Sequence, residues 1–153
     1  MNHALREAGL LARMLAWRAV LPLLRRRVRI ATLARVMWRE PHARPGGTDP
    51  IRIAELARVL YRGPGRGQGD TCLERSLLAY RYLSKAGVDP QLVIGIGRPD
   101  SLMIGHAWVV VNDEPLYDSA AEVGKYSSFF SFGRGGALLA TPSDRAQVGA
   151  VEG

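Results

Sequence analysis

The chain has 153 residues and a mass of 16.7 kDa, with 47% hydrophobic and 23% charged residues. This length fits one domain with its own core, and the hydrophobic fraction excludes disorder over most of the chain. A single cysteine excludes an intrachain disulfide and a multi-cysteine zinc site, and it fits a reducing compartment. The net charge of +7 lies in residues 1–66, which hold fourteen arginines and four acidic residues.

The first helix is predicted from the spacing of apolar residues over positions 4–20. Four of them recur at helical intervals: Leu10, Met14, Trp17 and Leu21. Pro22 should end or kink this helix, because proline lacks the backbone N–H and its ring obstructs the preceding turn. A second helix is then predicted for residues 23–39. No apolar run reaches the roughly 18–20 residues that span a bilayer, and arginines interrupt any signal-peptide core, so we expect a cytoplasmic protein without a transmembrane segment.

Two loops and a short helix are predicted next. Residues 40–50 have the composition of a loop. Asp49 should cap a helix over Ile51–Tyr61, with Pro50 at its first position. The glycine-rich segment 63–69 should form a second loop.

The central helix is predicted from a capping box and a closing glycine. Thr71 should be the N-cap and Glu74 the reciprocal residue at the third helical position. Gly87 is the expected C-cap glycine, so the helix should cover Cys72–Ala86. Cys72 would then lie in the first turn.

Short strands are predicted after the central helix. They cover residues 91–96, 106–111 and 115–119, with turns at 98–100 and 112–114. Three aromatic residues further on are expected to close one side of the core: Phe129, Phe130 and Phe132. The tail from Gly133 should be loosely ordered, although its composition allows a short strand at 137–140. Helices first and strands later predict an α+β fold, in which the central helix packs on a small antiparallel sheet.

A cysteine, a histidine and an aspartate stand where they could form a nucleophilic site. A free thiol is mostly protonated at neutral pH, and a helix N-terminus or a nearby histidine lowers its pKa. Cys72 should lie at a helix N-terminus, and His106, at a strand entry, could be the nearby histidine. Asp118 could bind the other ring nitrogen and orient the imidazole. The backbone N–H of Cys72 is then a candidate oxyanion donor.

The place of Asp118 depends on the length of the turn before it. A three-residue loop at 112–114 would set Asp118 diagonally to His106 on the same face of the sheet. A two-residue turn would move it to the opposite face. The hypothesis of a Cys-His-Asp site therefore requires an odd loop or a bulge.

The same stretch resembles a known family. The segments C-L-x-R-S-L from Cys72 and H-A-W-V from His106, with Asp118 twelve positions later, are similar to the leader peptidase of lasso-peptide biosynthesis, in a split form without a fused recognition domain. The resemblance covers about a third of the chain. It implies a papain-related, transglutaminase-like fold, with Cys72 as nucleophile, His106 as base and Asp118 as orienting acid.

The resemblance also implies a division of the chain and a set of partners. Residues 67–132 would form the transglutaminase-like cysteine peptidase core, after a basic helical region at 1–66 and before the tail at 133–153, within one compact domain. The partners would be the leader segment of a precursor peptide, a separate leader-recognition protein and an ATP-dependent macrolactam cyclase. No cofactor or metal is needed in this mechanism, and no nucleic-acid partner is expected.

Several residues keep a structural interpretation beside a functional one. Trp108 is either core or a wall of the substrate site, or both, and Arg75 is either solvated or a salt-bridge partner. Glu74 should point back to its N-cap, because a carboxylate beside the thiol would raise the thiol's pKa. The arginines at 25–29 form either a solvated helix face or a docking surface for a partner or leader peptide. The loop at 63–69 lacks the ending of a phosphate-binding loop.

Two other functions remain compatible with these residues. An acyl transferase of the transglutaminase type would use the same three residues, with an amine in place of water. A basic interaction module with a degenerate protease fold would use none of them for chemistry.

Overall fold

The computed structural model describes residues 3–41, 49–62, 68–97 and 101–139. Its helices are α1 (His3–Arg27), α2 (Ile30–Met37), α3 (Pro50–Leu60), α4 (Gln68–Lys85) and α5 (Ala120–Val123), with a 3-10 turn, η2 (Arg134–Gly136). Its strands are β1 (Gln91–Gly97), β2 (Ile104–Val111), β3 (Glu114–Pro115), β4 (Tyr126–Phe132) and β5 (Leu138–Leu139). The predicted turn at 98–100 and most of the predicted loops at 40–50 and 63–69 lie outside the described residues.

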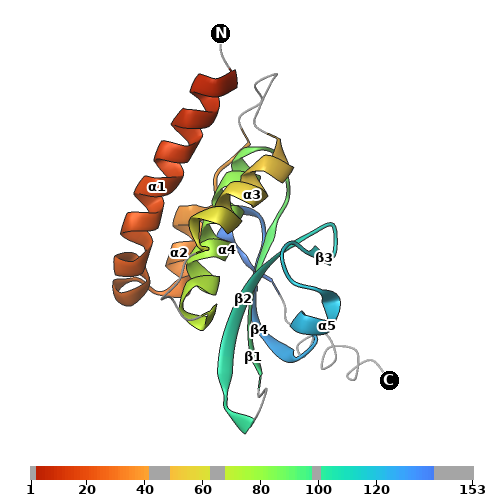
Figure 1. Cartoon of the computed structure of the whole chain (residues 1–153). Helices are drawn as coiled ribbons and strands as arrows, with labels where there is room; N and C mark the ends of the chain where they lie inside the picture. Colours follow the sequence, from red (N-terminus) through yellow and green to blue (C-terminus); the bar gives the residue numbers. More distant parts are fainter. Residues whose placement is uncertain (1–2, 42–48, 63–67, 98–100, 140–153) are drawn as a thin grey trace.

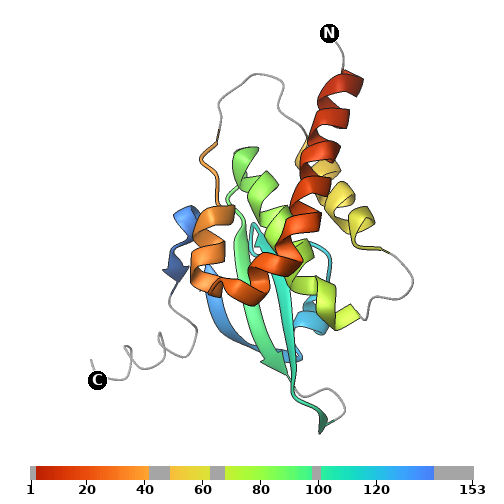
Figure 2. The ribbon, with the colours of Figure 1, turned by 90° about the vertical axis from the view of Figure 1, so that its left-hand side faces the viewer.

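The strands form one antiparallel sheet in the order β3-β2-β1-β4-β5. Helix α4 packs on this sheet, mostly on β2, and α1, α2 and α3 pack around α4 (Figure 1). From the side, α1 crosses in front of α4, with the sheet behind both (Figure 2). The core fills the space between the helices and the sheet, with Tyr80, Leu92 and Phe132 among its largest buried side chains. The predicted α+β architecture is confirmed.

Helix α1 does not end at Pro22. It continues to Arg27, and the break before α2 falls at residues 28–29, so the predicted helix boundaries at 20 and 23 are wrong. The apolar stripe explains the difference: Leu21 is fully buried just before Pro22, and Leu24 packs on the core just after it. Tertiary packing on both sides of a proline can outweigh the loss of one backbone hydrogen bond.

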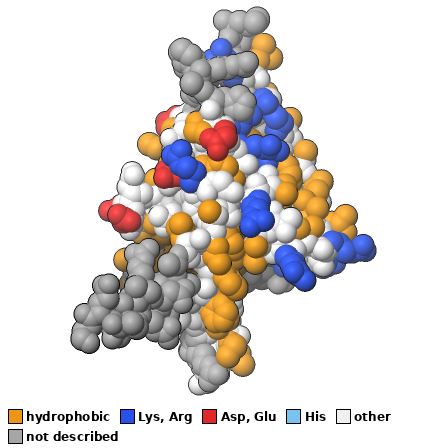
Figure 3. Space-filling view, turned by 180° about the vertical axis from the view of Figure 1, so that it is seen from behind, with side chains coloured by type: hydrophobic (Ala, Val, Ile, Leu, Met, Phe, Trp, Pro, Cys, Tyr) orange, Lys and Arg blue, Asp and Glu red, His pale blue; other side chains and the backbone are white. Residues whose placement is uncertain are grey.

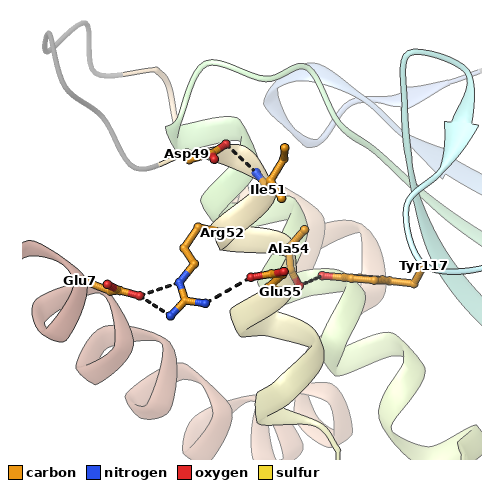
Figure 4. A network of polar contacts seen from close by, with 7 residues as sticks. All are labelled: Glu7, Asp49, Ile51, Arg52, Ala54, Glu55 and Tyr117. Atoms are coloured by element: carbon orange, nitrogen blue, oxygen red, sulfur yellow. Dashed lines mark hydrogen bonds and ion pairs between the residues drawn. The ribbon is translucent and has the colours of Figure 1, made fainter. Parts of the chain in front are cut away.

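Helix α3 has the predicted cap and is tied to its neighbours. The Asp49 carboxylate accepts a hydrogen bond from the Ile51 N–H at 3.0 Å. Arg52 donates to Glu7 of α1 at 2.6 Å, and the Tyr117 hydroxyl donates to the Ala54 carbonyl at 2.7 Å (Figure 4). The bond from Tyr117 to Ala54 anchors the residue directly before Asp118 to α3.

Helix α4 begins earlier than the capping box predicts. It starts at Gln68, so Thr71 is not its N-cap, and Cys72 is its fifth residue and lies beyond the first turn. The predicted boundary at 71 and the loop assignment of residues 68–69 are therefore wrong. The predicted C-cap is confirmed: Gly87 has φ +89°, and the Val88 N–H donates to the Leu83 carbonyl at 3.1 Å.

The C-terminal half differs from the prediction in several places. Of the strand predicted at 115–119, only Pro115 lies in a strand, because β3 ends there. Strand β4 was not predicted, and a register shift in its pairing with β1 interrupts the alternation that would have indicated it. Phe132 is buried, but Phe129 and Phe130 are 55% and 37% exposed, so only one of the three aromatic residues closes the core. Within the described part of the tail, η2 and β5 are regular, and β5 confirms the short strand.

None of the helices in the described residues is long and apolar enough to cross a membrane.

Candidate active site

Three elements bring Cys72, His106 and Asp118 together. Cys72 comes from α4, His106 from β2, and Asp118 from the bend that follows β3. The Nε2 atom of His106 lies 3.2 Å from Oδ2 of Asp118. The imidazole also forms a hydrogen bond with the Cys72 side chain. Because Nε2 is engaged with Asp118, Nδ1 is the ring nitrogen left to face sulfur.

The predicted route of the chain to Asp118 is wrong, although the contact forms. Val111 pairs with Glu114, so the turn is the two-residue Asn112-Asp113, and both of these residues have positive φ. In a regular hairpin this turn would put Asp118 on the face opposite His106. However, β3 is only two residues long, and residues 116–118 form a bend. The ladder register therefore no longer governs the direction of Asp118.

The backbone of Ala107 joins the helix to the strand at this site. Its N–H donates to the Cys72 sulfur, and its carbonyl accepts from the Ser76 hydroxyl at 3.0 Å. In an antiparallel strand the N–H and C=O of one residue point to the same side, and residues i and i+4 of a helix share a face. Cys72 and Ser76 thus dock on one edge of β2, which sets the sulfur beside the neighbouring His106.

The environment of Cys72 favours the thiolate. Burial raises the pKa of the thiol, which is 5% exposed. The hydrogen bond from His106, the Ala107 N–H and the charges of His106 and Arg75 act in the opposite direction and outweigh burial, so the pKa lies below its ordinary value. The helix N-terminus was expected to contribute, but its effect falls off within the first turn, and Cys72 lies beyond that turn.

Because α4 begins at Gln68, the backbone N–H of Cys72 is not available as the expected oxyanion donor. In an α-helix each N–H pairs with the carbonyl four residues earlier. The N–H of Cys72 therefore belongs to the Gln68 carbonyl, because Gln68 is already in α4.

His106 and Asp118 are both held in their charged forms. The hydrogen bonds to Asp118 and to Cys72 raise the pKa of His106 to about 9, against the effect of burial. The hydrogen bond from His106 lowers the pKa of Asp118, and the positive charge of Arg75 adds to this. At neutral pH the site therefore holds an imidazolium between a carboxylate and a thiol whose pKa is lowered, which is the order of groups that a cysteine nucleophile needs.

Arg75 completes the charge pattern, as a residue of the site that the motif of cysteine, histidine and aspartate does not include. Its guanidinium lies 4.0 Å from Oδ2 of Asp118 and 4.8 Å from the centre of the Tyr117 ring. Of the two sequence interpretations, the salt-bridge partner is confirmed. The spacing of Arg75 in the sequence could have indicated this place in the site, because a residue three positions after Cys72 lies on the same helix face.

Aromatic rings fix the orientation of His106. Trp108 stacks on the imidazole with a centroid distance of 5.7 Å, and the Tyr126 ring lies 4.9 Å away. The Trp108 indole itself lies over Gly95, where an added Cβ would be 2.9 Å from the ring. Trp108 is 5% exposed and packs against His106, and its predicted contact with substrate stays a prediction.

Glu74 does not form the predicted capping box. Its side chain is buried, and Oε1 lies 2.9 Å from Nε of Arg25 at the end of α1. One arginine of the predicted basic cluster is thus used inside the protein. The pairing neutralises a buried negative charge.

We expect Asp118→Asn to lower the pKa of His106 from about 9 toward its ordinary 6.5. The asparagine keeps the shape of the side chain but removes the charge that stabilises the imidazolium. An NMR titration of the His106 ring protons measures the shift. Asp113→Asn, an exposed change in the β2–β3 turn, should leave the titration where it is. An unchanged His106 pKa in Asp118→Asn would refute the assigned role of the carboxylate.

The arrangement is suited to acyl transfer through sulfur. A thiolate attacks a carbonyl carbon, and an imidazolium can protonate the leaving group. Within the described residues, no three His, Cys, Asp or Glu side chains are grouped to hold a metal ion.

Comparison with known proteins agrees with this chemistry. A family model described as the Transglutaminase-like superfamily matches residues 11–131. Comparisons with curated proteins and with solved structures found no match. The superfamily generally contains cysteine proteases and acyltransferases. The match covers most of the chain and spans the helices as well as the three residues of the candidate site, so the chain belongs to the transglutaminase-like superfamily.

Proposed function

We propose that the protein is a cytoplasmic cysteine peptidase that removes the leader from a ribosomally made precursor peptide during lasso-peptide maturation. The observation that carries the catalytic part is the hydrogen-bonded row of Cys72, His106 and Asp118, in which the thiol pKa is lowered despite burial. The superfamily match supports a cysteine-protease type of fold. The substrate class rests on the resemblance of the segments around Cys72 and His106 to the leader peptidases.

Each of the three residues has one task in the proposed reaction. The Cys72 thiolate attacks the carbonyl at the junction of leader and core and forms a tetrahedral intermediate. His106 transfers its proton to the leaving amine, which releases the core peptide and leaves a thioester with the leader. A water molecule, deprotonated by His106, then hydrolyses the thioester. Asp118 orients the imidazole and stabilises its charged form throughout.

The proposed partners follow from the resemblance to leader peptidases of the split form, which lack a fused recognition domain. A separate recognition protein would present the leader, and an ATP-dependent cyclase would close the macrolactam on the released amine. The peptidase would need no cofactor for its own step.

The decisive experiment is mass spectrometry of a precursor peptide incubated with this protein and its recognition protein. We expect two fragments whose masses sum to the precursor plus one water, and no fragments with Cys72→Ala. Cys72→Ser is a matched variant that keeps the shape and should also be inactive, because a serine hydroxyl is a far weaker nucleophile here. Full cleavage by Cys72→Ala would overturn the proposal.

The same spectra test the alternative of acyl transfer. A transferase would give a leader fragment that has gained the mass of an added amine instead of water. An intact precursor with every variant and with the wild type would favour the interaction module.

A further inference from the structure

A pocket lies on the helical side of the molecule, away from Cys72. It has a volume of about 410 Å³. Four cationic and two aromatic side chains are among the eight that line it, and none of the eight is acidic: Arg13, Trp17, Arg39, Arg81, Tyr82 and Lys85. We call it the basic pocket. Viewed from behind, Lys and Arg side chains gather among hydrophobic ones on the α1 side of the molecule (Figure 3).

The basic pocket is separate from the candidate active site. Arg81 follows Cys72 by nine residues on α4, which is about 14 Å along the helix axis and about two and a half turns. Two and a half turns place Arg81 on the opposite side of α4 from Cys72. A ligand in the basic pocket therefore does not compete with chemistry at the thiol.

Arg81 is oriented before any ligand arrives. Its guanidinium lies 4.3 Å from the centre of the Trp17 ring, and Nη1 donates to the Val36 carbonyl at 3.1 Å. A guanidinium has five donor N–H groups in a fixed plane, so these contacts leave donors for an anion. Burial and the positive charge of Arg39 both lower the pKa of Arg81, a cost that a bound anion would offset.

The lining favours a carboxylate on a peptide over a nucleotide. A nucleobase would need an open aromatic face for stacking. The Trp17 ring already carries Arg81 on one face, and Tyr82 is 4% exposed. Apart from the two aromatic rings, the pocket is lined by cationic side chains next to apolar side chains of α1, such as that of Val20. We infer that the basic pocket binds an acidic side chain of a polypeptide segment in which acidic and apolar residues stand side by side.

The test is fluorescence anisotropy with a rhodamine-labelled ten-residue peptide of alternating glutamate and leucine. The 153-residue chain should bind it, more weakly as salt rises, and should bind the matched glutamine–leucine peptide at least about tenfold more weakly. Arg39→Gln and Arg81→Gln should each weaken binding of the acidic peptide about tenfold. Arg39 is exposed, so its variant remains informative if Arg81→Gln affects folding.

Arg134→Gln is the control, because this arginine is exposed on η2. An equal loss of binding in Arg134→Gln would reduce the inference to general charge attraction and overturn it. Equal affinity for the two peptides, or displacement of the acidic peptide by AMP at lower concentration than by unlabelled peptide, would also overturn it. Cys72→Ala should bind the acidic peptide as the wild type does, so this inference and the proposed peptidase activity can fail independently.

Discussion

Replacing His106 with alanine should lower the rate of the proposed peptide cleavage by about a thousandfold, a typical effect of losing a general acid–base residue. The same change should slow alkylation of Cys72 at mildly acidic pH. His106 supplies the largest contribution that lowers the thiol pKa. Without it, only the Ala107 N–H and the charge of Arg75 oppose burial, so the thiol pKa should rise. Iodoacetamide labelling followed by mass spectrometry, from pH 5 to pH 9, measures the thiolate directly. It requires no substrate.

The labelling experiment separates the role of His106 from a folding defect. His3→Ala, at the first residue of α1, is the matched control and should keep the labelling profile of the wild type. A His106→Ala protein that unfolds would expose Cys72 and show the ordinary profile of a free thiol, and circular dichroism identifies that case. A folded His106→Ala protein that still labels quickly at pH 6 would contradict the thiolate–imidazolium pair.

Replacing Arg25 with methionine should destabilise the protein by about 3 kcal/mol, the lower end of the range for breaking a buried ion pair. The Glu74 side chain is 3% exposed and Arg25 is 28% exposed, so the charge left behind is the buried one. Equilibrium unfolding in urea measures the loss. The double variant Arg25→Met, Glu74→Met should recover most of it, because two apolar side chains can replace a buried pair at little cost.

Arg26→Met is the matched control for this prediction. It is the next residue on α1 and is exposed, so its free energy of unfolding should change by no more than about 0.5 kcal/mol. If Arg25→Met and Arg26→Met behave alike, or if the double variant is less stable than Arg25→Met, the pair with Glu74 does not stabilise the fold.

Patterns that depend on near neighbours in the chain were predicted correctly. The apolar stripe of α1, the Asp49 cap and the Gly87 C-cap follow from helical periodicity and from backbone geometry at single positions. The strands β1 and β2 follow from runs of apolar residues between turns. Each of these features is decided within about one turn or one strand, so sequence was sufficient.

Features that balance local preference against packing were predicted wrongly. Pro22 ought to stop a helix, but the burial of Leu21 carries α1 past it. Thr71 and Glu74 match a capping box, but Glu74 pairs with Arg25 from a helix more than forty positions away in sequence. A local signal states only what a residue can do with its neighbours, and a distant partner can offer a lower free energy.

By itself, the sequence determined the fold class, the central helix that carries Cys72 and the strand that carries His106. Only the tertiary structure decided how Asp118 reaches the imidazole. Strand β3 ends after two residues, and the following bend, which the Tyr117 hydroxyl ties to the Ala54 carbonyl of α3, turns the Asp118 carboxylate back to His106. The pKa of the thiol is likewise a tertiary property. It depends on burial and on the Ala107 N–H and the His106 imidazole of β2, whose distances from Cys72 no spacing along the chain can specify, together with the charge of Arg75 on α4.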